Sequence, residues 1–432
     1  MLELDCRLQF VPEFDADFFN CMPSRPGVLL LEMRDAKAKP YLARTADIRR
    51  AAERLLLAPG APSKRLNLRD VVAGIHYRVS GSKFEQMLTM YEQARKYFPD
   101  RYGSLLRLRP SALLKINLRN EYPRGYVTRR IRADGGFYFG PFASRRAAEA
   151  FSESFLDLFK TRRCQIKIRR DPAFPGCIYS EMKMCLAPCF AGCSKQEYDV
   201  EVGRVLETLD SGGSFLIKEI QAQREAASEA LHFEKAAALH KRLEKVSGTL
   251  RGWGELTRRI DEIDAVILQR AAEEKTIVVF PVQAGILAEP LFLRFAELST
   301  EPKSVEGILR AVLDPQTSFA HRKPSESKVD SSAEINSSAQ PQEEGASPQS
   351  QAQKSDVPAS NRSRYGLQSA PPELAEHLSL LSRWFYSKPR EGEILFREDS
   401  WPYRRILRAC NRLLAPTPGP TQEPQPGTQS AT

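Results

Sequence analysis

The chain has 432 residues, of which 42% are hydrophobic, and its 64 lysines and arginines exceed its 54 aspartates and glutamates, which gives a formal net charge of +10. This length allows roughly three domains with cores of their own, and the positive charge suits an anionic partner such as a nucleic acid. No apolar run approaches the roughly 20 residues that span a bilayer, and the first residues lack the basic start and apolar run of a signal peptide, so we expect a cytoplasmic protein without membrane contact.

The first hundred residues alternate between strand and helix patterns. Residues 1–22 are predicted to be a short N-terminal extension. The apolar run GVLLLEM and, after a turn, a short strand that begins YLA predict a hairpin, and TADIRRAAERLLL predicts a helix that follows it. A third strand, VVAGIHYRV, and a second helix, SKFEQMLTMYEQARKYF, complete a small α/β domain over residues 23–104.

A basic segment of strand and helix patterns, residues 105–163, leads into a cysteine-rich segment, residues 164–193. This segment contains five of the eight cysteines of the chain. Four of them are separated by 12, 7 and 3 residues: Cys164, Cys177, Cys185 and Cys189. Thiolates are soft ligands that suit zinc or an iron–sulfur cluster. Paired CxxC motifs favour zinc, whereas this uneven spacing, with Pro188 before the last cysteine, leans towards a cluster, and spacing alone leaves both open.

Two interpretations of these cysteines do not involve four metal ligands. Buried free thiols are common in protein cores, but five cysteines within thirty residues, among arginines and lysines, argue against that interpretation. Disulfides are disfavoured because nothing marks the chain as secreted. Cys193 is either a spare ligand or a bystander.

Helical patterns follow the cysteine-rich segment. A helical connector is predicted over residues 194–214 and an antiparallel helical hairpin over residues 215–250, turning near His232, because the apolar residues of each half recur on one helix face. Two helices of this length cannot bury both of their faces alone, so the hairpin is expected to have a partner. A plain coiled-coil hairpin is the alternative.

The C-terminal part is predicted to be one β-rich domain in two pieces. Alternating strand patterns cover residues 258–314, and order resumes with helix and strand patterns over residues 373–413. Residues 315–372 and 414–432 have the composition of a disordered insertion and a disordered tail. The expected fold class is α+β multidomain, with a small α/β domain, a cysteine-rich metal-bound segment, a helical hairpin, a partial β-rich domain, and a disordered linker and tail.

Several motifs, in one order over about 170 residues, resemble the UvrC family, the C subunit of excinuclease ABC. The layout PGV, a turn, YLAR, a basic helix, a strand and a helix ending in PDRY resembles its GIY-YIG nuclease domain. The likeness continues through SALLKINLRNEYPRGYVTRRIRADGGFYFGPFAS and LFKTRRC into the cysteines. It implies a 4Fe-4S cluster, with zinc as the alternative, on Cys164, Cys177, Cys185 and Cys189, and it leaves Cys193 out.

The string LHFEKAAALHKRLEKV resembles the UVR motif, through which UvrC proteins contact UvrB. This resemblance implies partner-binding roles for Phe233, Glu234, Ala236 and Ala237. It also implies that the chain stops before the RNase H-like nuclease and the helix-hairpin-helix module of the family.

Phosphodiester hydrolysis needs a base, a cation and usually a carboxylate that holds a divalent metal. Carried over one position at a time, the two tyrosines, the lysine, the helix arginine and the metal-binding glutamate of the family fall on Leu29, Tyr41, Arg44, Ala51 and Met90. Arg50 is one step from the arginine position. The vestigial catalytic candidates are Tyr41, Arg44 and Arg50. Mg²⁺ or Mn²⁺ is expected only if the site is active, with Glu85 or Glu92 replacing the missing carboxylate.

Arginines recur between the first helix and the first cysteine, with aromatic residues among them at Tyr126 and 137–139. A single arginine is ordinarily a solvated surface charge, but together they can neutralise phosphates without reading a base sequence. The candidate DNA-binding residues are Arg49, Arg54, Arg129, Arg130, Arg132, Arg145, Arg146, Arg162 and Arg163.

These features predict a DNA-repair protein that binds DNA and a UvrB-like protein, and UvrA indirectly, with a degenerate nuclease site. An active endonuclease that makes a single incision in nucleotide-excision repair is one alternative. A zinc-stabilised interaction protein outside repair is another.

Overall fold

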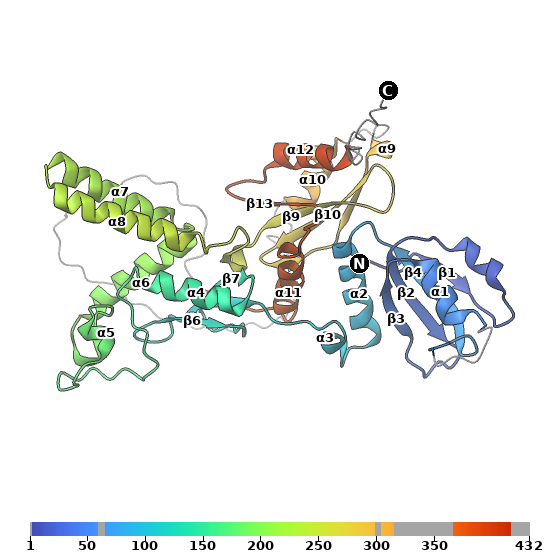
Figure 1. Cartoon of the computed structure of the whole chain (residues 1–432), viewed down its shortest axis with the longest axis horizontal. Helices are drawn as coiled ribbons and strands as arrows, with labels where there is room; N and C mark the ends of the chain where they lie inside the picture. Colours follow the sequence, from blue (N-terminus) through green and yellow to red (C-terminus); the bar gives the residue numbers. More distant parts are fainter. Residues whose placement is uncertain (1, 59–64, 299–303, 315–365, 416–432) are drawn as a thin grey trace, which may run out of the picture.

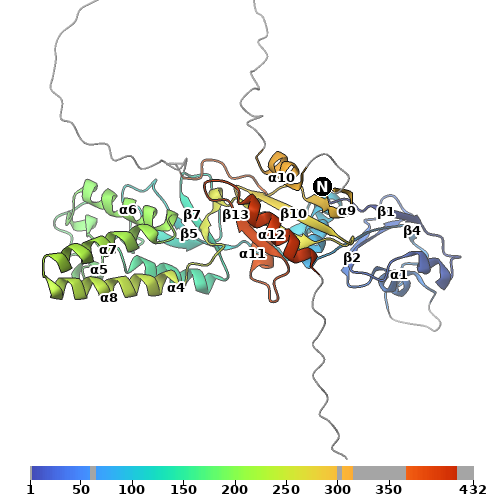
Figure 2. The ribbon, with the colours of Figure 1, turned by 90° about the horizontal axis from the view of Figure 1, so that it is seen from above.

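The computed structural model describes residues 2–58, 65–298, 304–314 and 366–415. They form three antiparallel sheets with helices packed around them, so the predicted α+β class is confirmed (Figure 1). The N-terminal sheet lies at one end of the molecule, the sheet of the C-terminal unit in the middle, and the remaining sheet with the helical hairpin at the other end (Figures 1 and 2). Among the described residues, no helix is long and apolar enough to cross a membrane.

The N-terminal sheet has the strand order β1-β4-β2-β3. Its strands and its covering helix are β1 (Cys6–Gln9), β2 (Gly27–Met33), β3 (Tyr41–Thr45), β4 (Val72–Val79) and α1 (Ile48–Leu56). The predicted hairpin, helix and third strand are present. The prediction of an N-terminal extension over residues 1–22 was wrong for residues 6–22. They are part of this unit, because β1 pairs with β4 and because Phe10 and the short helix η1 (Ala16–Cys21) contribute to the core under α1.

Helix α2 (Lys83–Tyr97), capped by Ser82, lies between the N-terminal sheet and the C-terminal unit. The Gln86 side chain donates hydrogen bonds of 2.8 Å to the carbonyl oxygens of Gly27 and Thr45 in the N-terminal sheet. Phe84 and Leu88 lie in the core of the C-terminal unit. The helix is therefore buried on more than one side, and its buried residues include the polar Glu85, Thr89 and Gln93. A short helix, α3 (Tyr102–Leu105), follows it.

The residues between α3 and η3 form the unit that we call the middle unit, after its place in the sequence. It is built on the sheet β6-β5-β7-β8. Its strands and helices are β5 (Ala112–Ile116), β6 (Gly125–Thr128), β7 (Phe137–Phe142), β8 (Arg258–Arg259), α4 (Arg145–Leu156), α5 (Ile178–Glu181), η2 (Pro188–Phe190), α6 (Lys195–Asp210), α7 (Ser214–Glu229) and α8 (Phe233–Leu250). Helices α7 and α8 form the predicted antiparallel hairpin. Leu216, Ile220 and Val246 pack its base into the core under α4.

The C-terminal unit has the strand order β11-β10-β9-β13, with β12 also paired to β10. Its elements are η3 (Ile260–Glu262), β9 (Ala265–Arg270), β10 (Thr276–Gln283), β11 (Ile286–Leu287), β12 (Leu291–Arg294), α9 (Phe295–Leu298), α10 (Val305–Leu313), α11 (Leu374–Phe385), β13 (Glu393–Phe396) and α12 (Tyr403–Leu414). Along β9, Ile267 faces the core under α11 and Val266 faces the core under α10 and α12. Because β13 pairs with β9, the two predicted pieces form one sheet.

The predicted disordered stretches lie mostly outside the described residues, which leave out 315–365 and 416–432. The prediction was wrong for residues 366–372, where Leu367 is buried and exchanges backbone hydrogen bonds with Gly135 and Gly136 in the β6–β7 loop. It was also one residue early at the tail, since Leu414 ends α12.

Candidate functional sites

The three catalytic candidates do not share one surface. Tyr41 pairs with Leu31 and packs against the core under α1, whereas Arg44 pairs with Val28 three residues further along β3. Side chains an odd number of residues apart point to opposite faces of a strand, so Tyr41 and Arg44 are separated by the sheet. Arg50 is exposed on α1.

Arg44 lies within electrostatic reach of α11. Burial, and then the charges of Arg44 and Arg109, lower the pKa of Arg383 on that helix. The neighbours of Arg44 are therefore cationic. Among the described residues, neither Tyr41 nor Arg44 makes a hydrogen bond or ion pair with a carboxylate.

The two glutamates that could replace the missing carboxylate are engaged elsewhere. Met90 is buried. Glu85 is buried too, accepts a 2.8 Å hydrogen bond from the backbone N–H of Gly81 and lies 3.5 Å from Arg78, and burial raises its pKa. Glu92 accepts a hydrogen bond from the backbone N–H of Leu2, and burial raises its pKa as well. Neither contact brings a carboxylate to Tyr41.

The predicted DNA-binding arginines fall into exposed and structural groups. The exposed ones are Arg54, Arg129, Arg130, Arg132, Arg145 and Arg146. Arg49 is half-buried and donates to the carbonyl oxygens of Met22 and Asn20. Arg163 is mostly buried and pairs with Asp157 at 2.6 Å. The arginines also do not form one surface, because α1 lies at one end of the molecule and β6 and α4 lie towards the other (Figure 1).

Arg162 was wrongly predicted to face DNA. It is only 6% exposed. Its Nε donates a 2.7 Å hydrogen bond to the carbonyl oxygen of Tyr122, and its Nη1 donates to that of Ile166 at 2.9 Å. It therefore ties the start of the cysteine-rich segment to the β5–β6 connection.

The aromatic residues of β7 were also assigned to the wrong environment. Phe137 and Phe139 lie in the core under α4, and Tyr138 lies in the core of the C-terminal unit. A strand buried on both faces is a continuous apolar run, which a sequence pattern does not distinguish from an aromatic surface.

The cysteine-rich segment is a set of loops with little regular structure. Cys164, Cys177 and Cys185 are half-buried, and Cys189 and Cys193 are buried. The backbone N–H of Ala187 lies 3.3 Å from Cys185 Sγ, and Nη1 of Arg162 lies 3.8 Å from Cys164 Sγ. Such donors stabilise a thiolate.

Four of the thiols interact electrostatically. Burial, and then the charges of Cys164, Cys177 and Cys189, raise the pKa of Cys185 to about 11, while the backbone N–H of Ala187 opposes this shift. Within the described part of the chain, no three His, Cys, Asp or Glu side chains are grouped so that they could hold a metal ion. What fits a metal centre is the donor set: four soft thiols that interact electrostatically, with N–H groups directed at two of the sulfurs.

Tyr198 of α6 holds this segment against the sheet, a role that sequence reasoning missed. Its hydroxyl donates to the carbonyl oxygen of Pro123 at 2.7 Å and accepts from the backbone N–H of Arg162 at 2.9 Å. Its ring meets that of Tyr122 edge to face at 5.3 Å. No short motif could have indicated these contacts, because Arg162 and Pro123 are 36 and 75 residues away from Tyr198 in the sequence.

The turn of the helical hairpin projects from the molecule (Figure 1). Leu231 and Phe233 are 70% and 66% exposed. Of the other predicted partner-binding residues, Glu234 and Ala237 are exposed and Ala236 is half-buried. Exposed apolar residues at the end of a helix pair are a feature of contact surfaces.

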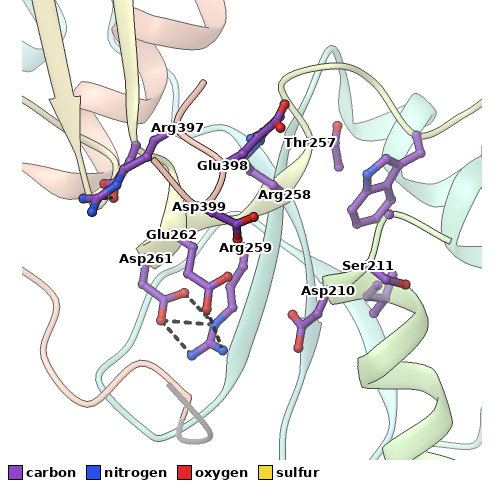
Figure 3. A pocket seen from close by; sticks show the side chains of 14 residues that line it. Asp210, Ser211, Thr257, Arg258, Arg259, Asp261, Glu262, Arg397, Glu398 and Asp399 are labelled. Atoms are coloured by element: carbon purple, nitrogen blue, oxygen red, sulfur yellow. Dashed lines mark hydrogen bonds and ion pairs between the residues drawn. The ribbon is translucent and has the colours of Figure 1, made fainter. Parts of the chain in front are cut away.

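A polar cavity of about 1000 Å³ lies where the α6–α7 turn, the chain after α8 and the loop after β13 meet (Figure 3). Its lining has six carboxylates and three arginines, a net charge of −3, and some of these charges are paired within the cavity. Arg259 lies 2.9 Å from Asp261 and 3.3 Å from Glu262, and Arg397 lies 3.8 Å from Asp264. None of the predicted site residues lines it.

Residues 112–208 match the family model described as UvrC/Cho excinuclease, middle domain, and residues 216–248 match the UvrB/uvrC motif. The chain is 29% identical over 273 residues to the UvrABC system protein C of Oleidesulfovibrio alaskensis, covering 62% of this chain and 38% of that protein. For that of Ruminiclostridium cellulolyticum the identity is 28% over 268 residues, with coverages of 61% and 43%. The chain thus spans less than half the length of these relatives. No solved structure matches it.

Proposed function

Because this chain is a UvrC-like protein, we propose that it is a nucleotide-excision-repair factor that binds DNA and a UvrB-like protein and does not cut DNA itself. The observation that carries this proposal is the state of the nuclease positions. Leu29 and Met90 are buried and apolar where the family has a tyrosine and a glutamate.

The remaining catalytic candidates do not compensate for this loss. A divalent metal at the leaving oxygen needs a carboxylate close to the activated nucleophile. Glu85 and Glu92 are the nearest carboxylates in sequence to Met90, and both are bound to backbone N–H groups away from Tyr41. Without the metal, the electrostatic stabilisation of the transition state is lost.

Binding functions are better supported. The exposed arginines around β6 and at the start of α4 can contact phosphates, and they lie within the part of the chain that resembles the UvrC middle domain. The exposed Phe233 at the end of the hairpin is suited to insertion between partner helices, as aromatic residues dominate the energy of interfaces.

The cysteine-rich segment would hold a 4Fe-4S cluster, or zinc as the alternative, on Cys164, Cys177, Cys185 and Cys189. When bound, this group would cross-link loops that have little regular secondary structure, and its role would be structural. The chain's own residues position the segment: Arg162 and Tyr198 clamp it to the β5–β6 connection.

The deciding experiment is a nicking assay on a lesion-bearing duplex with anaerobically purified protein, UvrA, UvrB and Mg²⁺ or Mn²⁺. We expect retention of UvrB and salt-sensitive DNA binding, but no nick. A metal-dependent nick that is lost in Tyr41→Phe would overturn the proposal in favour of an active endonuclease. A protein that binds neither DNA nor UvrB would overturn it in favour of an interaction protein outside repair.

A further inference from the structure

A groove of about 380 Å³ lies between α12 and the segment around β13. It is lined by Glu255, Arg390, Glu393, Ile394, Leu395, Arg405, Arg408 and Arg412. Four arginines face two glutamates, so the lining carries a net charge of +2. No predicted site residue belongs to it.

Three arginines of α12 form one stripe along the helix, and the opposite face of the helix packs against the C-terminal sheet. Arg405, Arg408 and Arg412 are spaced three and four residues apart and so share one face. The opposite face, with Ile406 and Cys410, is buried against the sheet.

Both ends of this helix are anchored. At its start, the Tyr403 hydroxyl donates to Asp314 at 2.6 Å, and the Trp401 ring N–H donates to the carbonyl oxygen of Leu313 at 2.9 Å. At its end, Arg270 of β9 donates to the carbonyl oxygens of Leu413 and Ala415. The stripe is therefore preorganised, which lowers the entropic cost of binding.

Arg412 is paired with Glu393 inside the groove through its Nε and Nη2, whereas the other groove arginines have weak pairs or none. Arg390 lies 3.6 Å from Glu255, and Arg405 lies 4.0 Å from Glu398. Arg408 has no hydrogen-bond or ion-pair partner among the residues that the structure describes. Exposed ion pairs of this kind contribute about 0–1 kcal/mol, so a phosphate can displace them.

We propose that this groove binds the phosphate backbone of duplex DNA. The stripe from Arg405 to Arg412 is about 10 Å long at the rise of an α-helix, which is long enough to contact more than one phosphate of a strand. None of the eight lining residues is aromatic, whereas single-stranded sites stack bases on aromatic rings. The choice of DNA over other polyanions rests on the proposed function; the groove adds a second contact, on the C-terminal unit.

The test is the salt dependence of binding of the full chain to a fluorescein-labelled duplex without a lesion. The double variant Arg405→Gln and Arg408→Gln should lower the slope of log K against log salt by about 1.8, at about 0.9 per phosphate contact. The matched control, Arg7→Gln with Arg294→Gln, removes two exposed charges outside the groove and should keep the wild-type slope. Unchanged thermal unfolding of both variants shows that they fold.

Each outcome decides the matter. A slope lowered in the groove variant alone supports the proposal. Equal slopes for the groove variant and wild type overturn it, leave the DNA binding of the proposed function standing, and point to an acidic protein segment as the occupant. Wild-type protein that does not bind duplex DNA overturns both the proposal and the DNA part of the proposed function. A larger slope change on a single-stranded oligonucleotide than on the duplex also overturns the proposal.

Discussion

Arg162 shows how a charged side chain can be structural in a basic protein. Its guanidinium is surrounded by backbone carbonyl oxygens, and it lies between the β5–β6 connection and the first cysteine. A buried cation must be hydrogen-bonded, because its desolvation is costly. In the sequence it resembles the exposed arginines around it.

Replacing this side chain should destabilise the middle unit. We expect Arg162→Met to lower the free energy of unfolding by about 3 kcal/mol, since the hydrogen bonds of a charged group are lost and carbonyl oxygens are left buried. The measurement is urea denaturation followed by the fluorescence of Trp253, which lies beside the core under α4. Arg129→Gln, at an exposed position, should change it by less than about 0.5 kcal/mol. Equal effects of the two changes would contradict this assignment.

His377 on α11 makes stability depend on pH. Its Nδ1 accepts a 3.1 Å hydrogen bond from the backbone N–H of Leu287, so the folded protein requires an unprotonated Nδ1. Burial, and then the charge of Arg95, lower the pKa of His377, while Glu373 and Glu376 oppose this shift. The unfolded chain therefore binds more protons than the folded one below about pH 6.5, and stability falls as the pH drops through that range.

The variant His377→Gln should remove this component, because an amide oxygen can still accept from Leu287. We expect the urea midpoint to fall less between about pH 7 and pH 5.5 in the variant than in the wild type. His240→Gln, at an exposed position on α8, is the control and should keep the wild-type dependence. A wild-type dependence in His377→Gln would show that another group is responsible.

At the scale of elements, the helical hairpin divides its two ends between folding and binding. Its base is packed into the core under α4 through Leu216 and Val246, whereas its turn carries exposed apolar residues. Because the residues of the turn are not part of the core, substitutions there should leave the fold intact. The turn is therefore the part of the hairpin that can be specialised for binding a partner.

The variant Phe233→Ala should separate these two roles. We expect no change in stability beyond about 0.5 kcal/mol and about 30-fold weaker binding of UvrB, as for the truncation of an aromatic residue central to an interface. Binding is measured by titration calorimetry. Lys241→Ala, an exposed change further along α8, should bind as the wild type does. Equal affinities of the two variants would remove Phe233 from the interface.

At the scale of the whole molecule, units that are far apart in the sequence share their cores. α2 contributes to the C-terminal core, and Tyr138 of the middle sheet joins the same core. The middle and C-terminal units are thus joined through packed side chains, while the cysteine-rich segment is attached through hydrogen bonds of Arg162 and Tyr198.

Mutation of a proposed metal ligand should test whether the cysteine-rich segment holds a metal centre. Protein purified anaerobically should contain iron and acid-labile sulfide, or zinc in the alternative case, and Cys185→Ala should lose them and unfold at a lower temperature. Cys193→Ala should retain both the metal and the unfolding temperature, since the proposed ligand set excludes it. Full metal content in Cys185→Ala, or loss in Cys193→Ala, would contradict that ligand set.

Local sequence patterns were sufficient for most elements. The hairpin of β2 and β3, the helices α1, α2 and α6, the α7–α8 pair and the strands of the C-terminal sheet lie where the patterns predict them. The order of the motifs also indicates the likeness to the UvrC family, which the matches of residues 112–208 and 216–248 support. These features are encoded by neighbouring residues, because hydrophobic periodicity and helix capping act within a few positions.

Only the tertiary structure decided which charged and aromatic residues are exposed. Arg162 is buried and Arg129 is not, and Phe137 faces a core. Contacts between segments that are distant in the sequence, such as those of Arg162 with Tyr122 and Tyr198, determine these environments. The groove along α12 likewise combines residues 255, 390–395 and 405–412. Burial depends on which distant segments pack together, and local composition carries no record of that choice.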